Sequence, residues 1–161
     1  MHKLFCITLP AILCACLASC VSKRSYISDM ADLPLKDTKL PSMSWQDTPL
    51  RANAQYVLYG AQSGKEIRGR LGDYFFVKWF DATPHERTQV EFLYTQAITA
   101  SKVLRREVRY DKPRRGRSTH KELFAFNGPE RAKNGDILSW RLNLIVNGQV
   151  VDSRRSYLWK D

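Results

Sequence analysis

The chain has 161 residues and a formal net charge of +10, from 26 Lys and Arg against 16 Asp and Glu. Hydrophobic residues make up 43% of it and aromatic residues 11%. This balance excludes a wholly disordered chain, a collagen-like chain and a polytopic membrane protein, and the length predicts about one globular domain.

The N-terminal segment has the features of an export signal. Residues 4–17 form an uncharged, mostly apolar run that follows His2 and Lys3. The run is shorter than the roughly 20 apolar residues that span a membrane. A basic start followed by an apolar core of about 7–15 residues is typical of a secretory signal peptide. A buried N-terminal helix is the alternative, which the lack of a polar face disfavours. We therefore expect residues 1–19 to be a signal peptide.

The segment ends in Leu17-Ala18-Ser19-Cys20, which is an aliphatic residue, two small residues and a cysteine. This motif resembles the lipobox of bacterial lipoproteins, although the resemblance covers only the N-terminus. It implies cleavage between Ser19 and Cys20, a diacylglyceryl group on the Cys20 thiol and often an acyl chain on the new amine. Cleavage before Cys16 is the alternative, which would place Cys14 where a small residue is usual. The implied partner is membrane lipid, held stably when two or more acyl chains insert.

The cysteine count predicts a domain without cross-links. Three of the four cysteines lie in the expected signal peptide, and the fourth is Cys20. The mature domain then has no disulfide despite an oxidising compartment, so its stability must come from core packing. Val21 follows the cysteine. Because an Asp there tends to retain Gram-negative lipoproteins in the inner membrane, the resemblance implies the outer membrane if the organism is Gram-negative.

Residues 20–52 are expected to form the lipidated cysteine and a flexible tether. Three prolines and scattered charges interrupt this stretch, and no period of 2 or 3.6 is sustained in it. A flexible chain of this length has a typical end-to-end distance of about 30 Å. The alternative is an arm in which Met43, Trp45 and Leu50 pack on the domain edge.

The remaining residues, 53–161, show strand signals at short intervals. Seven strands are expected, at residues 55–59, 73–80, 88–99, 102–110, 120–126, 137–146 and 149–159. Asn147-Gly148 joins the last two, and this dipeptide predicts a type I′ hairpin turn, which needs positive φ twice. Asn127-Gly128-Pro129 and Asn134-Gly135 mark another reversal, between the fifth and sixth strands.

This pattern predicts an all-β fold. Seven short strands separated by turn signals favour a two-sheet antiparallel sandwich of the immunoglobulin or fibronectin type III kind, without its disulfide, and that fold needs about 100 residues. Residues 86–101 could be helical in isolation, but their β-branched and aromatic residues favour a strand. Trp79 and Trp140 are the candidates for the centre of the core.

A basic cluster is the most unusual feature of the mature chain. Its members are Arg105, Arg106, Arg109, Lys112, Arg114, Arg115, Arg117 and Lys121. The stretch Arg114-Arg115-Gly116-Arg117 is expected in an exposed turn, and guanidinium groups bind phosphates and carboxylates bidentately. Anionic lipid, lipopolysaccharide and peptidoglycan are therefore candidate ligands, whereas export argues against nucleic acid. The alternative is a solvated hairpin tip that serves solubility alone.

Catalytic groups are scarce in the expected mature chain. It keeps His85 and His120 but no thiol nucleophile. It has no G-x-S-x-G, H-E-x-x-H or glycine-rich phosphate loop, and no spacing typical of a metal site. We therefore expect no catalytic residues, no metal and no cofactor.

Together these features predict a lipid-anchored lipoprotein of the cell envelope. Its expected role is non-catalytic binding or scaffolding, with anionic envelope ligands bound through the basic cluster. One alternative is a subunit of a larger envelope assembly that docks on a protein partner by a sheet edge. The other is a glycan-acting enzyme, which would need a cleft with carboxylates clustered around His120.

Overall fold

The computed structural model describes residues 24–36, 48–99 and 102–160. The expected signal peptide, its cleavage site and Cys20 lie outside the described residues, as do Met43 and Trp45. Predictions about those positions therefore stay predictions.

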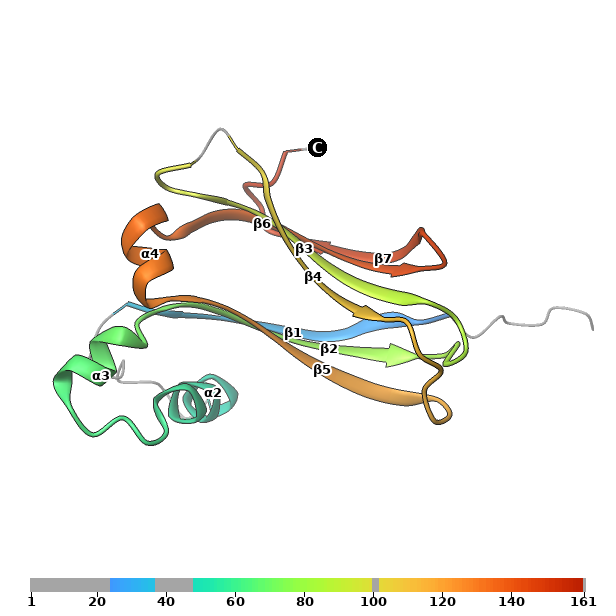
Figure 1. Cartoon of the computed structure of the whole chain (residues 1–161), viewed down its shortest axis with the longest axis horizontal. Helices are drawn as coiled ribbons and strands as arrows, with labels where there is room; N and C mark the ends of the chain where they lie inside the picture. Colours follow the sequence, from blue (N-terminus) through green and yellow to red (C-terminus); the bar gives the residue numbers. More distant parts are fainter. Residues whose placement is uncertain (1–23, 37–47, 100–101, 161) are drawn as a thin grey trace, which may run out of the picture.

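Two antiparallel sheets make up most of the molecule and face each other in two layers (Figure 1). The first sheet has the order β1-β2-β5 and the second has the order β4-β3-β6-β7. The strands are β1 (Tyr26–Leu35), β2 (Gly72–Asp81), β3 (Thr88–Gln96), β4 (Leu104–Tyr110), β5 (Ser118–Asn127), β6 (Ile137–Val146) and β7 (Gln149–Arg155). The prediction of seven strands in two antiparallel sheets is confirmed, although one strand is not where it was expected.

The flexible-tether prediction is wrong for residues 26–35, which form β1. This strand pairs along its length with β2, and Ile27, Leu33 and Leu35 are buried. A register shift between Ile27 and Asp29 moves the later residues to the other face, so the period of two breaks in the sequence. Pro34 is tolerated because β1 is an edge strand.

The strand predicted at residues 55–59 is also wrong, because residues 55–58 belong to helix α2 (Thr48–Leu58) and Tyr59 lies in the turn that follows it. Pro49 suits the first turn of a helix. The apolar residues Leu50, Ala54, Val57 and Leu58 follow at helical spacing and supply one packing face. The short apolar run Tyr56-Val57-Leu58-Tyr59 fits either period when it is read alone.

Short helices occupy two of the connections. Helix α3 (Gly64–Gly69) begins with a capping box formed by Ser63 and Glu66. The reversal predicted between the fifth and sixth strands contains helix α4 (Gly128–Asn134), and Gly135, which caps its C-terminus, has a φ of 79°. None of the helices within the described residues is long and apolar enough to cross a membrane.

The main core lies between the two sheets and is rich in aromatic rings. Phe92 of β3 is fully buried, and its ring lies 4.7 Å from Phe75 and 5.1 Å from Phe124 between centroids. Trp79 is fully buried, as predicted, whereas Trp140 is half-buried with its ring 6.0 Å from Phe92. Aromatic pairs of this kind add to the stabilisation from apolar burial.

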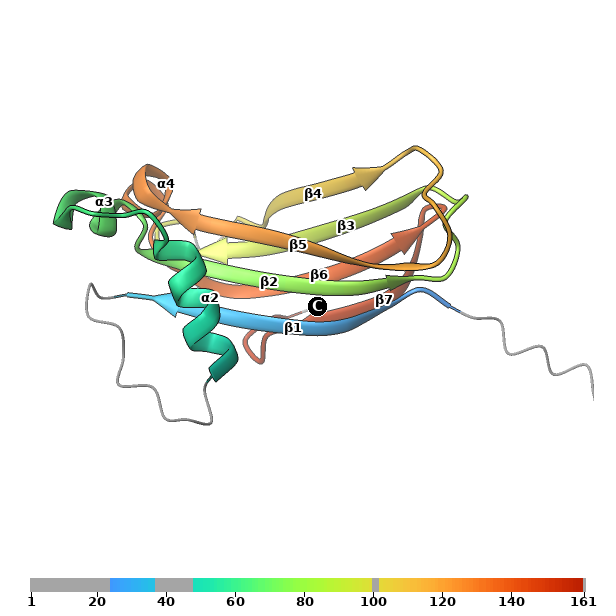
Figure 2. The same cartoon turned by 90° about the horizontal axis from the view of Figure 1, so that it is seen from below.

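A second core lies on the outer face of the three-stranded sheet, where α2 crosses it (Figure 2). Leu33 and Leu35 of β1 and Tyr74 of β2 pack there against Ala54, which is fully buried. The three-stranded sheet is therefore covered on both faces in this region.

The inner face of β2 carries a buried aspartate near each end. Asp73 accepts hydrogen bonds from Lys36 Nζ at 2.6 Å and from the Ile137 N–H at 2.9 Å. Asp81 pairs with Arg114 at the opposite end. Three apolar residues, Phe75, Val77 and Trp79, fill the strand between them. The carboxylates thus mark the two ends of the core.

The turn between β6 and β7 has the predicted conformation. Asn147 has a φ of 50° and Gly148 a φ of 80°. Two successive positive values are what a type I′ turn requires.

Candidate functional site

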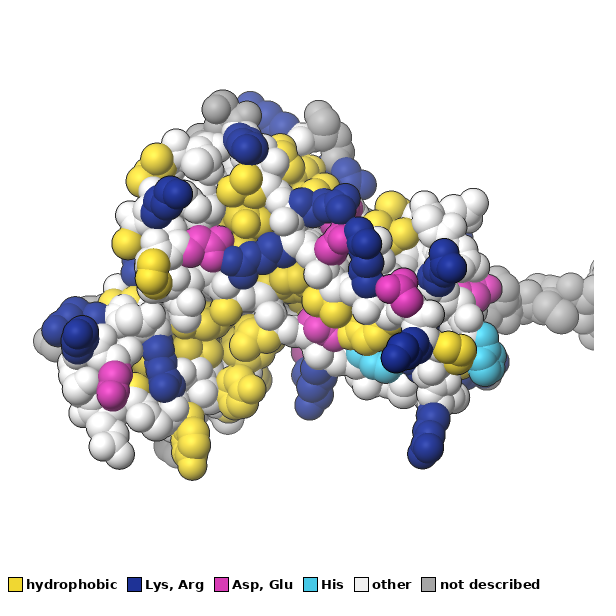
Figure 3. All heavy atoms as spheres, in the orientation of Figure 1, with side chains coloured by type: hydrophobic (Ala, Val, Ile, Leu, Met, Phe, Trp, Pro, Cys, Tyr) yellow, Lys and Arg dark blue, Asp and Glu magenta, His cyan; other side chains and the backbone are white. Residues whose placement is uncertain are grey.

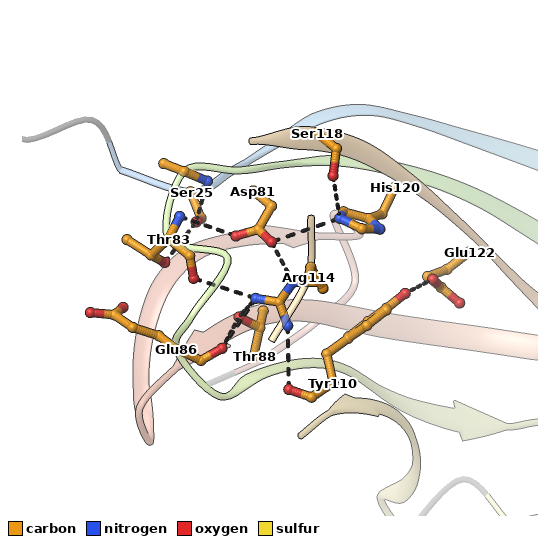
Figure 4. A network of polar contacts seen from close by, with 11 residues as sticks. Ser25, Asp81, Thr83, Glu86, Thr88, Tyr110, Arg114, Ser118, His120 and Glu122 are labelled. Atoms are coloured by element: carbon orange, nitrogen blue, oxygen red, sulfur yellow. Dashed lines mark hydrogen bonds and ion pairs between the residues drawn. The ribbon is translucent and has the colours of Figure 1, made fainter. Parts of the chain in front are cut away.

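Several connections meet at the end of the sandwich where the described chain begins. Ser25 Oγ accepts a hydrogen bond from the Ala82 N–H at 3.0 Å. The backbone N–H of Arg114 donates to the Pro84 carbonyl at 2.8 Å, and the backbone N–H of Asn147 donates to the Arg87 carbonyl at 2.9 Å. We call this region the Ser25 end, formed by residues 24–25, 82–87, 111–117 and 147–148. Figure 4 shows Ser25, Thr83, Glu86 and Arg114 of this region. The opposite end, which carries α3 and α4, is the far end.

Arg114 is the centre of the Ser25 end. Its guanidinium pairs with Asp81, whose side chain is fully buried, and the Arg114 side chain is itself only 9% exposed. It also donates to Thr88 Oγ1 at 2.8 Å and to the Glu86 carbonyl at 3.1 Å (Figure 4). A guanidinium has five donors in a fixed plane, so one side chain joins the β2–β3 connection to the β4–β5 loop.

The prediction that residues 114–117 are all exposed is therefore wrong for Arg114. Its neighbours Arg115 and Arg117 are exposed, and Gly116 has a φ of 63°, consistent with the expected turn. The turn directs Arg114 inward, where its charge is balanced by Asp81 rather than offered to a ligand.

His120 lies beside this ion pair and stacks on Trp79, with ring centroids 4.5 Å apart and an interplanar angle of 22°. Burial lowers the pKa of His120, and the positive charge of Arg114 acts in the same direction, while Asp81 opposes the shift. The neutral imidazole is thus favoured. On β5, Glu122 accepts a hydrogen bond from the Tyr110 hydroxyl, and burial raises the pKa of Glu122.

Ser118, His120 and Asp81 lie close together but do not form a catalytic triad. Ser118 Oγ is 2.9 Å from His120 Nε2, and Asp81 Oδ2 is 3.7 Å from the same nitrogen. A triad needs the hydroxyl and the carboxylate on different ring nitrogens, and Asp81 is already engaged by Arg114. The arrangement therefore favours a structural role for His120.

The rest of the basic cluster is divided among several places. Arg105 and Arg109 lie on the exposed face of β4, where both pair with Glu107. Arg106 points the other way, pairs with Glu130 and lies 4.3 Å from the centroid of the Phe126 ring. In Figure 3, basic side chains are scattered over the visible face and interleaved with acidic ones.

Lys121 is separate again, since it lines a groove of about 510 Å³ between α2 and the three-stranded sheet. The eight predicted residues therefore do not form one surface.

Three members of the cluster remain together and exposed: Lys112, Arg115 and Arg117 on the β4–β5 loop. Within the described residues, no carboxylate forms an ion pair with any of the three. Arg24 and Arg87 are exposed at the same end of the molecule. Sequence reasoning missed these two because they are far from the loop along the chain.

The Ser25 end is also hollowed. A hollow of about 760 Å³ is lined by residues that include His85, Arg87, Arg109 and Asn147. A second hollow of about 440 Å³ lies between residues 82–86 and Gly116-Arg117. Glu86 lines both hollows and Asp111 lines the larger one, so carboxylates border these spaces together with the basic and polar groups. Among the described residues, no three His, Cys, Asp or Glu side chains are grouped as metal ligands.

Comparison with known proteins returned no family model, no curated protein and no solved structure that matches this chain. The interpretation of the Ser25 end therefore depends on its own geometry and chemistry.

Proposed function

We propose that this protein is a membrane-anchored envelope lipoprotein whose domain is a non-catalytic binding module for anionic ligands. The anchor is the lipidated Cys20, which the lipobox at residues 17–20 supports. The ligand contacts are made by Lys112, Arg115 and Arg117 on the β4–β5 loop.

One observation carries the proposal: Arg114 fixes the loop while its neighbours stay exposed. The guanidinium of Arg114 is hydrogen-bonded to Asp81, to Thr88 and to the Glu86 carbonyl. A loop tied at this point loses less conformational freedom on binding than a mobile one, which favours affinity. Exposed guanidinium and ammonium groups suit phosphates and carboxylates.

We also propose that the fold belongs to the immunoglobulin and fibronectin type III class of sandwiches. In an immunoglobulin constant domain, the first, second, fifth and fourth strands form one sheet, and the third, sixth and seventh form the other. The order β1-β2-β5 and β4-β3-β6-β7 differs only in the sheet to which the fourth strand belongs. An experimental structure with a different strand order would contradict this assignment.

The binding proposal is tested with the mature chain carrying a Cys20→Ser substitution, so that the acyl anchor does not contribute. Vesicles of neutral phospholipid are compared with vesicles that contain anionic phospholipid or lipopolysaccharide. We expect binding to the anionic vesicles only, and weaker binding as salt is raised, because the contacts are electrostatic.

Two triple variants locate the contact. Lys112→Ser/Arg115→Ser/Arg117→Ser should lower the affinity at least tenfold. The matched control, Lys65→Ser/Lys102→Ser/Lys133→Ser, removes the same charge from exposed positions at the far end and should change affinity less than threefold. Equal loss in the two variants would mean that only net charge matters, and the proposal would be wrong.

A further inference from the structure

The chain is fixed to the domain from Ser25 onward. Ser25 is 3% exposed, its hydroxyl accepts a hydrogen bond from the Ala82 N–H, and it lies 3.4 Å from Thr83 Oγ1. Tyr26 then begins β1 and pairs with Phe80. Ser25 follows Cys20 by five positions, and five residues of fully extended chain span at most about 17 Å. A lipid on Cys20 would therefore hold Ser25 close to the bilayer, in contrast to the long tether expected from the sequence.

The far end of the sandwich is beyond this reach. β2 runs from the far end toward the Ser25 end (Figure 1), and its ten residues span about 33 Å. If the far end faced the membrane, Ser25 would stand about that far above the headgroups. The short connection excludes this orientation, and it brings the Ser25 end to the lipid.

From this geometry we propose that the Ser25 end docks on the headgroups of the leaflet that holds the anchor, with anionic phospholipid as its partner. The inference rests on the proposed lipidation of Cys20 and gives the binding module its ligand and its orientation. The module then binds the membrane that holds its own anchor rather than a separate anionic molecule.

The charges of the Ser25 end fit this partner. Its exposed cations are Arg24, Arg87, Lys112, Arg115 and Arg117, and its exposed carboxylates are Glu86 and Asp111. The surface potential of an anionic leaflet acts over a Debye length, about 8 Å at physiological ionic strength. The exposed lysines of the far end, such as Lys65 and Lys133, lie more than a Debye length from the leaflet when the Ser25 end faces the membrane.

The docking surface is held as one unit. Hydrogen bonds join residue 25 to residue 82, residue 114 to residue 84, and residue 147 to residue 87. The buried Asp81–Arg114 pair lies directly behind these connections. Cations on separate loops therefore keep a constant spacing, which allows several of them to contact headgroup phosphates at the same time.

The test uses the full lipidated protein in vesicles that contain anionic phospholipid. Cysteine occurs only at positions 6, 14, 16 and 20, so after processing an introduced cysteine is the single free thiol. His85→Cys places a fluorophore at the Ser25 end, and Tyr59→Cys places one on an exposed side chain after α2. A headgroup-labelled quenching lipid then reports which end is near the membrane.

We expect at least threefold stronger quenching at position 85 than at position 59. Mass spectrometry of the same sample determines whether Cys20 is acylated. An acylated Cys20 with equal or reversed quenching would overturn the docking inference and leave the proposed function standing. An unmodified Cys20 would overturn both.

A longer tether separates the effect of the anchor from that of the charges. A flexible insertion of about 20 residues after Val21 lowers the effective concentration of the domain at the membrane. Quenching at position 85 should persist in this variant, and it should disappear when Lys112→Ser/Arg115→Ser/Arg117→Ser is added. Loss of quenching with the insertion alone would show that the tether, and not the basic surface, sets the orientation, and would overturn the headgroup contact.

Discussion

Asp81 and Arg114 are 33 positions apart in the chain and form an ion pair from which solvent is almost excluded, with side-chain exposures of 0% and 9%. The pair connects β2 to the loop that follows β4. Because the same guanidinium also binds Thr88 and the Glu86 carbonyl, it links three segments that are separate in the sequence.

Removing the cation should destabilise the protein strongly. Arg114→Met leaves the Asp81 carboxylate buried without its partner, and breaking a buried pair in this way costs about 3–5 kcal/mol. The neighbouring Arg115→Met removes an exposed cation and should change the free energy of unfolding by no more than about 0.5 kcal/mol. Urea unfolding of the two variants distinguishes them, and similar midpoints would show that the pair is not structurally important.

His120 should make stability depend on pH below neutrality. Burial, with a further contribution from Arg114, lowers the pKa of His120, while an unfolded histidine titrates near pH 6.5. The folded state therefore resists protonation in that range. The stability that neutral His120 contributes is fully present above its pKa in the unfolded chain. This stability is lost as the pH falls through the lower pKa that His120 has in the folded protein.

The variant His120→Phe keeps an aromatic ring against Trp79 but has no titratable group. Its free energy of unfolding should fall less than that of the unmodified protein between pH 7 and pH 5. Urea unfolding at several pH values measures both slopes. Glu122, whose pKa burial raises, is present in both proteins and so does not affect the difference between them. Identical slopes would contradict the assignment to His120.

Regular alternation made most of the fold predictable from the sequence. β3 alternates between buried and half-buried residues over all nine positions, β2 alternates in its second half, and Asn147-Gly148 identified the β6–β7 turn. β1 was missed because its alternation of apolar and polar residues is interrupted. A register shift follows Ile27, and the strand also contains Asp29, Asp32 and Pro34. Helix α2 was missed because its apolar residues were read as a short strand.

The candidate site was predictable only in part. The run of basic residues located the β4–β5 loop, since exposed cations and a glycine-containing turn are local features. That Arg114 turns inward depends on Asp81, and the presence of Arg24 and Arg87 at the same end depends on the strand order. Contacts between residues so far apart in sequence follow from the tertiary fold, which no local pattern specifies.

Gly72 should tolerate no side chain. A Cβ at this position would lie 2.2 Å from the Phe126 carbonyl oxygen and 2.8 Å from Asn127 Cα, both of which are backbone atoms. Gly72→Ala should therefore destabilise the protein by about 1–3 kcal/mol through overpacking where β2 meets β5. At Gly69 in α3 a Cβ meets nothing within 4 Å, so Gly69→Ala should be neutral or slightly stabilising. Thermal unfolding of the pair would contradict this account if Gly69→Ala proved the more harmful change.

Helix α2 should detach from the sheet when its buried face is altered. Ala54 is fully buried against Leu33, Leu35 and Tyr74, so Ala54→Arg forces a long charged side chain into an apolar contact and should cost about 2 kcal/mol or more. Ala52 is exposed on the same helix, and Ala52→Arg provides the matched control. Hydrogen exchange should show faster exchange across residues 48–58 in Ala54→Arg, with β3 and β6 still protected, because the core between the sheets does not include α2. Uniform loss of protection across the whole domain would instead mean that the two cores unfold together.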